Sequence, residues 1–323
     1  MVHGRLQSIQ ALRFIAASLV VVTHASHAFP LGNVGCDIFF VISGFIIASL
    51  LPKHTPTSFL RSRLTRIYPF WWAILLPKMV YQIVVNGKWD AARAFTSITL
   101  WPVMGDFTVP YLFVGWTLCF EMLFYVCASL VLVDRRAAPV LTLAYVVALA
   151  GALAVGTPLL AFVGNPIILE FLMGVLIARL PGARPAIGGG AVMGGIAAIV
   201  LFTTPQLSHP YGVFDVSQPL RAVLWGVPAA VLVWGALQLE PLFKGRAASA
   251  LAYGGDASYS IYLVHMLVIA PLAAFIPWTL LAVLAIGVGL LVHRHLEKPL
   301  LSLVRSKARH GGKSVSHDRH RLA

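Results

Sequence analysis

The feature that most constrains this chain is a succession of apolar blocks, each about as long as a bilayer is thick. A helix needs roughly 20 apolar residues to cross the hydrocarbon core, and such blocks recur from residue 9 to residue 293. Only 11% of the residues are charged, whereas about a quarter are charged in a soluble globule. The sequence therefore predicts an all-α polytopic membrane protein, and it excludes disordered, collagen-like and secreted disulfide-framework classes.

We expect about ten transmembrane helices. Their expected ranges are 9–29, 34–51, 68–86, 111–133, 138–156, 166–180, 187–204, 219–238, 257–275 and 278–293. The stretch 89–108 is apolar in patches but broken near Trp101 and Pro102. We expect it to be an interfacial or re-entrant segment.

The orientation follows from the basic residues between the spans. They gather in alternate gaps, for example Arg61, Arg63 and Arg66 before the third span, and they continue after the tenth. An even number of spans places all these gaps on one side, which the positive-inside rule makes cytoplasmic. Both termini are therefore expected in the cytoplasm. Residues 1–300 would form the membrane domain, and residues 301–323 a basic, disordered tail near anionic headgroups.

The net charge of +13 and the three cysteines do not indicate other partners. The basic residues lie in the gaps and the tail rather than on one folded face, so no nucleic-acid partner is expected. Cys36, Cys119 and Cys127 lie within apolar blocks and have no metal-ligand spacing. We interpret them as small buried hydrophobes and expect no metal site.

Polar groups inside spans are costly and therefore indicate function more often than elsewhere. The first span carries Arg13 and His24, which are eleven positions apart. At about 100° per residue they share one helix face, with His24 about 16 Å deeper than Arg13. Snorkelling would explain the arginine alone, and an interhelical hydrogen bond would explain the histidine alone. Their common face favours a shared site.

The second span adds a carboxylate and a surface of small residues. Asp37 is expected close in depth to His24, where it can orient the imidazole or keep it protonated. The alternative is a carboxylate that stabilises the N-terminus of its own helix. Ser43 and Gly44 are expected to let another helix approach closely.

Arg63 and Arg66 are three positions apart before the third span, which places them on one side of a helical turn. An arginine pair suits phosphate oxygens through bidentate, charge-assisted bonds. The alternative is a topogenic cluster that faces lipid headgroups.

Two further spans carry polar groups at membrane depth. Glu121 is isolated on the fourth span and must find a partner elsewhere or stay protonated, most simply with His24 or Arg13. On the ninth span, Ser258, Tyr262 and His265 follow i, i+4, i+7 spacing and form one polar stripe. A structural polar seam remains the alternative for this stripe.

Taken in order, these residues resemble the membrane-bound acyltransferase-3 family, and in particular its exopolysaccharide O-acetyltransferase branch. The match runs from Leu6 to Pro299, and each of its parts is weak alone. They are the Arg13–His24 spacing, the block 35–45, the turn Arg63-Leu64-Thr65-Arg66, the block 116–125 with Glu121, the stripe 258–265 and the ending Glu297-Lys298-Pro299.

The resemblance implies transfer of an acyl group, usually acetyl from acetyl-CoA, to a hydroxyl of an envelope or exported carbohydrate. The acceptor would be a free or lipid-linked saccharide, and the location a bacterial-type inner membrane. Acetyl-CoA would be a co-substrate, with no permanently bound cofactor.

The residues fit these roles. Arg13, Arg63 and Arg66 would hold the anionic end of coenzyme A at the cytoplasmic face. His24 would act as general base or, as a weaker alternative, take the acyl group itself. Glu121 and Asp37 would orient or charge-balance it. The expected substrate-binding residues are Trp116, Ser258, Tyr262 and His265.

Two other functions remain open at this point. A transporter or flippase for a polar or lipid-linked solute would also place Arg, His and Glu in a polar seam. However, the two halves show no corresponding pair of Gly- or Pro-broken helices. A third reading is an acyltransferase that acts on a lipid or a small molecule.

Overall fold

The computed structural model describes residues 5–26, 29–87, 89–102, 108–203, 220–304 and 306, and within these residues the regular structure is helical, with no strand. The first half contains α1 (Gln7–Ala25), η1 (Pro30–Asn33), α2 (Val34–Leu50), η2 (Leu51–Lys53), α3 (Pro56–Asn86), α4 (Ala91–Thr99), η3 (Phe113–Gly115), α5 (Trp116–Val133) and α6 (Ala137–Val155). The second half contains α7 (Pro158–Val163), α8 (Ile168–Ile177), α9 (Pro185–Phe202), η5 (Ala222–Gly226), α11 (Val227–Gln238), η6 (Glu240–Leu242), α12 (Gly245–Asp256), α13 (Ser258–Leu272), α14 (Trp278–Val292) and η7 (His293–Glu297).

The structure confirms an all-α polytopic membrane protein. Seven of the described helices are long and apolar enough to span a membrane, and two shorter apolar helices accompany them. The seven are Gln7–Ala25, Leu31–Lys53, Phe113–Val133, Ala137–Val155, Pro158–Ile177, Pro185–Phe202 and Trp278–Val304; the shorter two are Ala222–Gln238 and Ser258–Leu272. With α3 these helices cover every predicted span. The total of ten and the cytoplasmic termini remain predictions.

Three features of the helices differ clearly from the prediction. The sixth span begins at Pro158 and is interrupted between α7 and α8, where Asn165 Oδ1 accepts the Ile167 amide at 3.0 Å. The gap before the ninth span contains the helix α12. The last helix continues through η7 to residue 304, beyond the predicted start of the tail, and residues 307–323 lie outside the described part.

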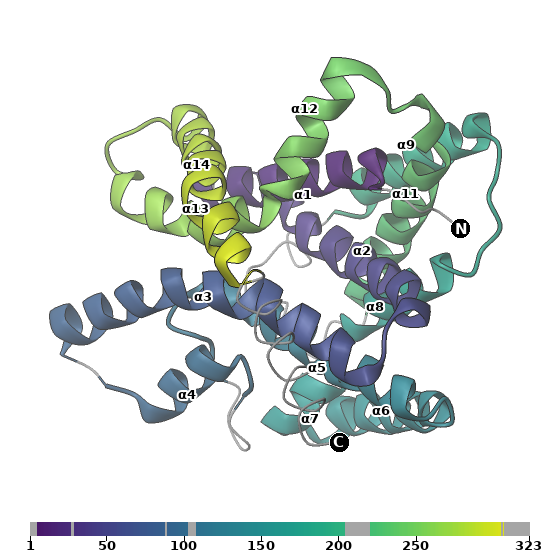
Figure 1. The fold of residues 1–323 in the computed structure, drawn as a ribbon, viewed down its shortest axis with the longest axis horizontal. Helices are drawn as coiled ribbons and strands as arrows, with labels where there is room; N and C mark the ends of the chain where they lie inside the picture. The colour runs from purple at the N-terminus through teal and green to yellow at the C-terminus, as the bar shows by residue number, and fades with distance from the viewer. Residues whose placement is uncertain are drawn as a thin grey trace, which may run out of the picture.

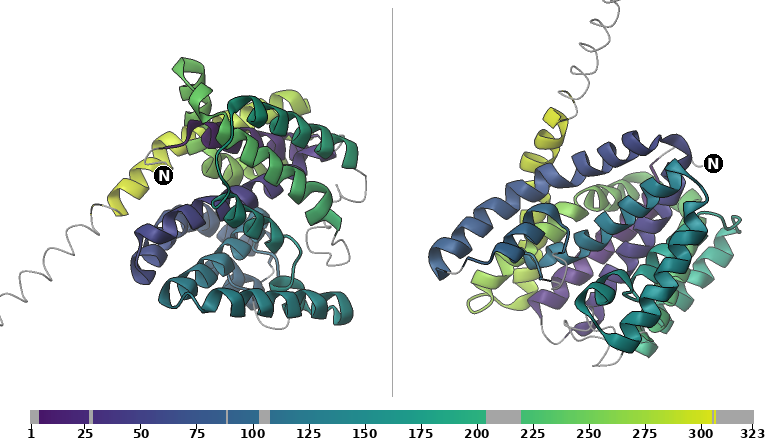
Figure 2. Two further views of the ribbon diagram at one scale, coloured as in Figure 1. Left: turned by 90° about the vertical axis from the view of Figure 1, so that its right-hand side faces the viewer. Right: turned by 90° about the horizontal axis from the view of Figure 1, so that it is seen from below.

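Helix α1 crosses the middle of the bundle in Figure 1, with α13 and α14 on one side and α9 and α11 on the other. It packs against α2, α12, α13 and α14, while α11 packs against α9. Both views in Figure 2 show the last helix projecting from the body at its yellow end. Residues of the N-terminal hairpin therefore face the interior, where polar groups from later helices can reach them.

Of the expected small-residue surface on α2, Gly44 packs against α8, whereas Ser43 lines the pocket described below. A Cβ atom on Gly44 would lie 2.0 Å from the Phe171 carbonyl oxygen, and one on Gly174 would lie 2.1 Å from the Val41 carbonyl oxygen. The two backbones therefore approach each other at distances that only glycine permits. This contact places the buried acid of α8, Glu170, beside α2.

Helix α3 joins the arginine turn and the third predicted span into one element of 31 residues. Its N-terminus is capped by Thr55, whose side chain accepts the Ser58 amide. It ends at Gly87, whose φ of 63° suits glycine. Arg63 and Arg66 thus lie on a helix that is continuous with the span, rather than in a loop before it.

The segment expected to be interfacial or re-entrant contains the short helix α4, which lies against α3. Three successive carbonyls at its C-terminal end accept hydrogen bonds from aromatic side chains of α3. Trp71 Nε1 donates to Ser97 O at 2.8 Å, Trp72 Nε1 to Ile98 O at 2.9 Å, and the Tyr68 hydroxyl to Thr99 O. Residues 103–107 of the predicted segment lie outside the described part.

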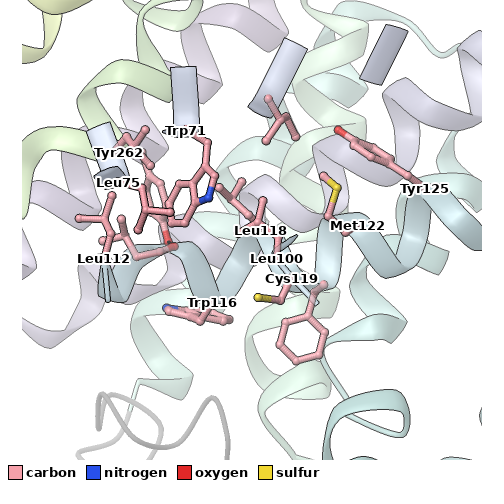
Figure 3. Close-up of a cluster of buried hydrophobic side chains, with 14 of the residues drawn as sticks. Trp71, Leu75, Leu100, Leu112, Trp116, Leu118, Cys119, Met122, Tyr125 and Tyr262 are labelled. Carbon is pink, nitrogen blue, oxygen red and sulfur yellow. Dashed lines mark hydrogen bonds between the residues drawn. The ribbon is translucent and has the colours of Figure 1, made fainter. Parts of the chain in front are cut away.

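The largest cluster of buried hydrophobic residues surrounds α5. Figure 3 shows Trp71, Trp116, Cys119 and Tyr262 among its members. All three cysteines are free, with Cys36 and Cys119 buried and Cys127 partly buried. The predicted burial is thus found for Cys36 and Cys119. The aromatic density of this cluster gives rigid walls to the site that it borders.

Candidate active site

Polar side chains from α1, α2, α3, α5 and α13 line one interior pocket with a cavity volume of about 120 Å³. We call it the arginine pocket. Its polar lining consists of Arg13, Cys36, Ser43, Arg63, Arg66, Thr117, Glu121, Tyr125, Ser258, Tyr259 and Tyr262. The pocket therefore brings together six of the ten residues that the sequence nominates for catalysis or binding.

The pocket has an excess of positive charge. Arg63 and Arg66 reach it from one face of α3, as their spacing predicts, and Arg13 reaches it from α1. Arg13 interacts electrostatically with both Arg66 and Glu121, and its Nη1 donates to Gln10 Oε1 at 3.2 Å. Three guanidinium groups around one carboxylate favour an anionic ligand, and their forked donors match phosphate oxygens.

Glu121 finds its hydrogen-bond partner on its own helix. The Tyr125 hydroxyl donates to Glu121 Oε1 at 2.5 Å, one turn further along α5. The sequence prediction named His24 or Arg13 as the simplest partner. Arg13 is a charged neighbour across the pocket, but the hydrogen bond comes from Tyr125. The i, i+4 spacing of the two residues is the signal that could have revealed this.

Tyr262 lies at the boundary between the arginine pocket and the two histidines. Its hydroxyl donates to the Val114 carbonyl at 3.2 Å and accepts from Thr117 Oγ1 at 3.2 Å. Its ring lines the pocket, packs edge-on against Phe39 at 6.1 Å and lies 5.8 Å from the His265 ring. Two hydrogen bonds and two ring contacts thus fix Tyr262 between the two parts of the site.

His24 and His265 form a pair next to this boundary. Their ring centroids are 5.0 Å apart. The His24 Nδ1 atom bonds to the Val20 carbonyl at 2.8 Å, and the His265 Nδ1 atom bonds to the Tyr262 carbonyl at 2.7 Å. Neither histidine is part of the pocket lining. The shared face of α1 thus places Arg13 in the pocket and His24 beside a second imidazole.

Asp37 requires a correction. The sequence prediction paired it with His24, but both of its oxygens accept from Arg221, from Nη2 at 2.8 Å and from Nε at 3.2 Å. Glu170 is its other charged neighbour. Asp37 is fully buried, and Arg221 also stacks over the Trp225 ring at 4.7 Å. A buried carboxylate needs a complete set of donors, and the guanidinium supplies it better than an imidazole.

The sequence prediction overlooked Arg221 as a partner of Asp37. A usable signal existed. Arg221 has no carboxylate nearby on its own helix, and Asp37 is a solitary acid expected at similar depth. Two opposite charges at one level of a bilayer can compensate each other.

The polar stripe of α13 divides between the two parts of the site. Ser258 and Tyr262 line the arginine pocket, whereas His265 lies beyond it beside His24. Trp116 takes a different place. It is buried against Phe40 and Phe120, with ring centroids 5.9 and 6.2 Å away, and it is not part of the pocket lining. Trp116 thus supports the wall rather than the cavity surface.

Apolar spanning helices around an interior cationic pocket, with a histidine pair next to it, define a multi-pass membrane protein. The acyltransferase-domain family matches residues 6–293. The chain belongs to this family, acyltransferase-3, and is an acyltransferase, as the resemblance in sequence implies.

Two relatives extend over most of the chain. It is 33% identical over 318 residues to the exopolysaccharide production protein ExoZ of Rhizobium meliloti. This alignment covers 87% of this chain and 93% of the relative. It is 25% identical over 319 residues to the acyltransferase MdmB of Streptomyces mycarofaciens, covering 82% and 79% respectively. No solved structure matches it significantly.

Proposed function

We propose that this protein transfers an acyl group, in the first instance acetyl, from acyl-CoA to a hydroxyl of an exported or cell-surface carbohydrate in the bacterial inner membrane. The observation that carries the proposal is the convergence of Arg13, Arg63 and Arg66 on one pocket. Family membership supplies the reaction class, and the positive charge of the pocket supports the choice of an acyl-CoA donor.

The donor assignment rests on charge. Coenzyme A carries its phosphates at the nucleotide end, and the arginines can bind them through charge-assisted hydrogen bonds. Ser258, Tyr259 and Tyr262 lead from the arginines toward the histidine pair along α13. An extended acyl-pantetheine arm that follows these side chains would bring the thioester toward His24.

The chemistry assigned to His24 is general base catalysis. Because Nδ1 bonds to a carbonyl oxygen, it carries the hydrogen, and Nε2 is the basic atom. Nε2 takes the proton of the acceptor hydroxyl while the oxygen attacks the thioester carbon. The carbon–sulfur bond then breaks, and the proton passes to the departing thiolate. The products are an ester and free coenzyme A.

The acceptor assignment is supported by the similarity to ExoZ, a protein of exopolysaccharide production. The ester would lie on a repeating unit of such a polymer or on its lipid-linked precursor. Family membership decides against the transporter alternative, since it makes the chain an acyltransferase. A lipid or small-molecule acceptor is the competing outcome of the experiment below.

The experiment uses purified full-length protein in lipid nanodiscs with acetyl-CoA labelled in the acetyl carbon. The acceptor is surface polysaccharide extracted from a strain that lacks the gene. We expect label in the polysaccharide that mild alkali releases as acetate, together with stoichiometric free coenzyme A. Label that enters only the lipid or small-molecule fraction would contradict the carbohydrate assignment, and no coenzyme A release would contradict the donor.

A further inference from the structure

A groove with an apolar lining runs along α1 on the side away from the arginine pocket. Its cavity volume is about 320 Å³, and its walls come from α1, η1, α2, α9, α11 and the residues that follow α11. Among the described residues, Ser8 is the one polar residue in its lining. Ile15 and Leu19 line it about 120–160° round the helix from Arg13. We call it the apolar groove.

The apolar groove has a protein floor and rims that face the membrane. Leu232 and Ala236 of α11 are only 6% and 7% exposed, whereas Ile15 of α1 and Ile196 of α9 are 46% and 44% exposed. All three helices are apolar helices of the membrane domain, so their exposed side chains contact hydrocarbon. Water does not fill an apolar cavity, and an empty one forfeits dispersion contacts. A hydrocarbon chain is therefore the occupant that the surroundings supply.

The length of the apolar groove corresponds to one leaflet of the bilayer. Along α1 its lining runs from Ser8 to Leu19, which is about 16 Å at 1.5 Å per residue. The hydrocarbon core is about 30 Å thick, so a chain in the groove spans about half of it. The fatty acyl chain of a phospholipid has this reach, whereas a polyprenyl carrier chain is much longer.

The Ser8 end of the groove offers a hydrogen-bond donor. Glu240 accepts the backbone amides of Gln7 and Ser8 at 2.9 and 2.8 Å, which holds the start of α1 against the segment after α11. Ser8 is 1% exposed, and its Oγ has no hydrogen-bond partner among the described residues. A buried hydroxyl without a partner is costly. An ester or phosphate oxygen of a lipid at this end would satisfy it.

The same end of the groove carries positive charge. Phe243 lines the groove close after Glu240, and the basic residues Lys244 and Arg246 that follow it are exposed. Basic residues at the end of a membrane helix attract anionic headgroups. This charge favours a phospholipid whose headgroup is negative.

We propose that the apolar groove binds one acyl chain of an anionic phospholipid. An ester or phosphate oxygen of the lipid accepts from Ser8 Oγ, and the headgroup lies on the side of Lys244. The bound chain fills the space between α1 and α9 and supports α1 behind the face that carries Arg13 into the arginine pocket. This lipid is a structural component, and its binding is independent of the acyl donor and the acceptor.

The experiment measures the thermal stability of the full-length protein in detergent after bound lipid has been washed away. Dioleoylphosphatidylglycerol is then added, because a ligand that binds only the folded state raises Tm. We expect a saturable rise for the wild type and a smaller one with dioleoylphosphatidylcholine. Ser8→Ala should need about 2- to 10-fold more phosphatidylglycerol for the same rise, since it loses one hydrogen bond.

A bulky substitution tests the location. Ile196→Trp places an indole in the groove and should lose the rise in Tm. Met193→Trp is the matched control, because Met193 is exposed on the same helix and does not line the groove. Its response to phosphatidylglycerol should equal that of the wild type.

Photocrosslinking of the wild type locates the chain even where a variant fails to fold. The protein is placed in nanodiscs that contain phosphatidylglycerol with a diazirine in its acyl chain. We expect label on α1, α9 and α11 that persists when excess phosphatidylcholine is added. Label on α6, where Leu143 is 66% exposed to bulk lipid, should be diluted.

Three outcomes would overturn the inference. An Ile196→Trp protein with the lipid response and labelling of the wild type would place the lipid elsewhere. Equal responses to phosphatidylglycerol and phosphatidylcholine, unchanged in Ser8→Ala, would remove the recognition of the headgroup. Displacement of the label by a polyprenyl phosphate at a lower concentration than by phosphatidylglycerol would assign the groove to a carrier lipid.

Discussion

Arg221 donates to both carboxylate oxygens of Asp37 across a sequence separation of 184 residues. The Asp37 side chain is fully buried and that of Arg221 is 5% exposed. The pair joins α2 to the helical segment that begins with η5, and it surrounds Asp37 with donors. The structure thus gives Asp37 an architectural partner, and its catalytic role stays a prediction.

Arg221→Met should destabilise the protein strongly, because it leaves the Asp37 carboxylate buried without its two donors. Breaking a buried pair from one side costs about 3–5 kcal/mol. The double variant Arg221→Met with Asp37→Asn should recover thermal stability in detergent, measured by size-exclusion chromatography after heating. It should also retain acyl transfer. A stable but inactive double variant would return Asp37 to the catalytic machinery.

Arg63→Ala and Arg66→Ala should each raise KM for acyl-CoA. A hydrogen bond to a charged group contributes about 1.5–3 kcal/mol, so we expect roughly a tenfold increase or more for each change. Lysine should restore only part of the affinity, since it returns charge without the bidentate fork. Arg61→Ala is the matched control, because Arg61 is exposed on the same turn and does not line the pocket. Equal effects at all three positions would indicate a topogenic cluster.

His24→Ala should abolish acyl transfer while insertion and donor binding persist. General base catalysis contributes about 10²- to 10⁴-fold to the rate, and kcat should decrease by a factor in that range. His54→Ala is the control, since the His54 imidazole bonds to Ser58 near the start of α3 and does not line the pocket. The neighbouring His27, which we expect to tolerate the same change, lies outside the described residues. Near-normal ester formation by His24→Ala would move the base to Glu121 or His265.

Gly44→Ala should weaken the packing of α2 on α8. The added Cβ would lie 2.0 Å from the Phe171 carbonyl oxygen, so one helix must shift. Gly287→Ala in α14 is the control, because nothing lies within 4 Å of its Cβ position. That change should be neutral or stabilise the helix by about 0.5–1 kcal/mol. Indistinguishable melting temperatures for the two variants would contradict the close backbone approach.

The predicted orientation can be tested with two reporter fusions. A reporter fused after Ala323 should be active as a cytoplasmic fusion, and a truncated fusion after Gly156 should be active as an extracytoplasmic one. Gly156 follows α6, at a gap without basic residues. The opposite pattern at either position would require a different number of spans.

The helices and the arginine pair were predictable because their determinants are local. A bilayer requires long apolar helices whatever their neighbours, and an i, i+3 spacing places two side chains on one face. Arg63 and Arg66 accordingly enter the same pocket. Helix α12 was not expected, because Lys244 and Arg246 marked its position as a gap.

The partners of the buried polar residues could not be read from periodicity. The spacing of Arg13 and His24 gives their common face, but the neighbour of that face depends on how α1 packs against α13. The same holds for Asp37, whose nearest candidate along the chain was the histidine of the preceding helix. Depth alone does not distinguish an imidazole from a guanidinium on a distant helix, whereas helix packing does.

The three aromatic side chains that bind the end of α4 also bear on how the chain is built. A helix in water can release its last carbonyls to solvent, but hydrocarbon offers them nothing. Tyr68, Trp71 and Trp72 provide the donors. Side chains of α3 thus take the place of water at the last carbonyls of α4. Because α3 is synthesised first, this surface is in place when α4 emerges. The hydrogen-bond donors that the end of α4 needs are therefore translated before α4 itself.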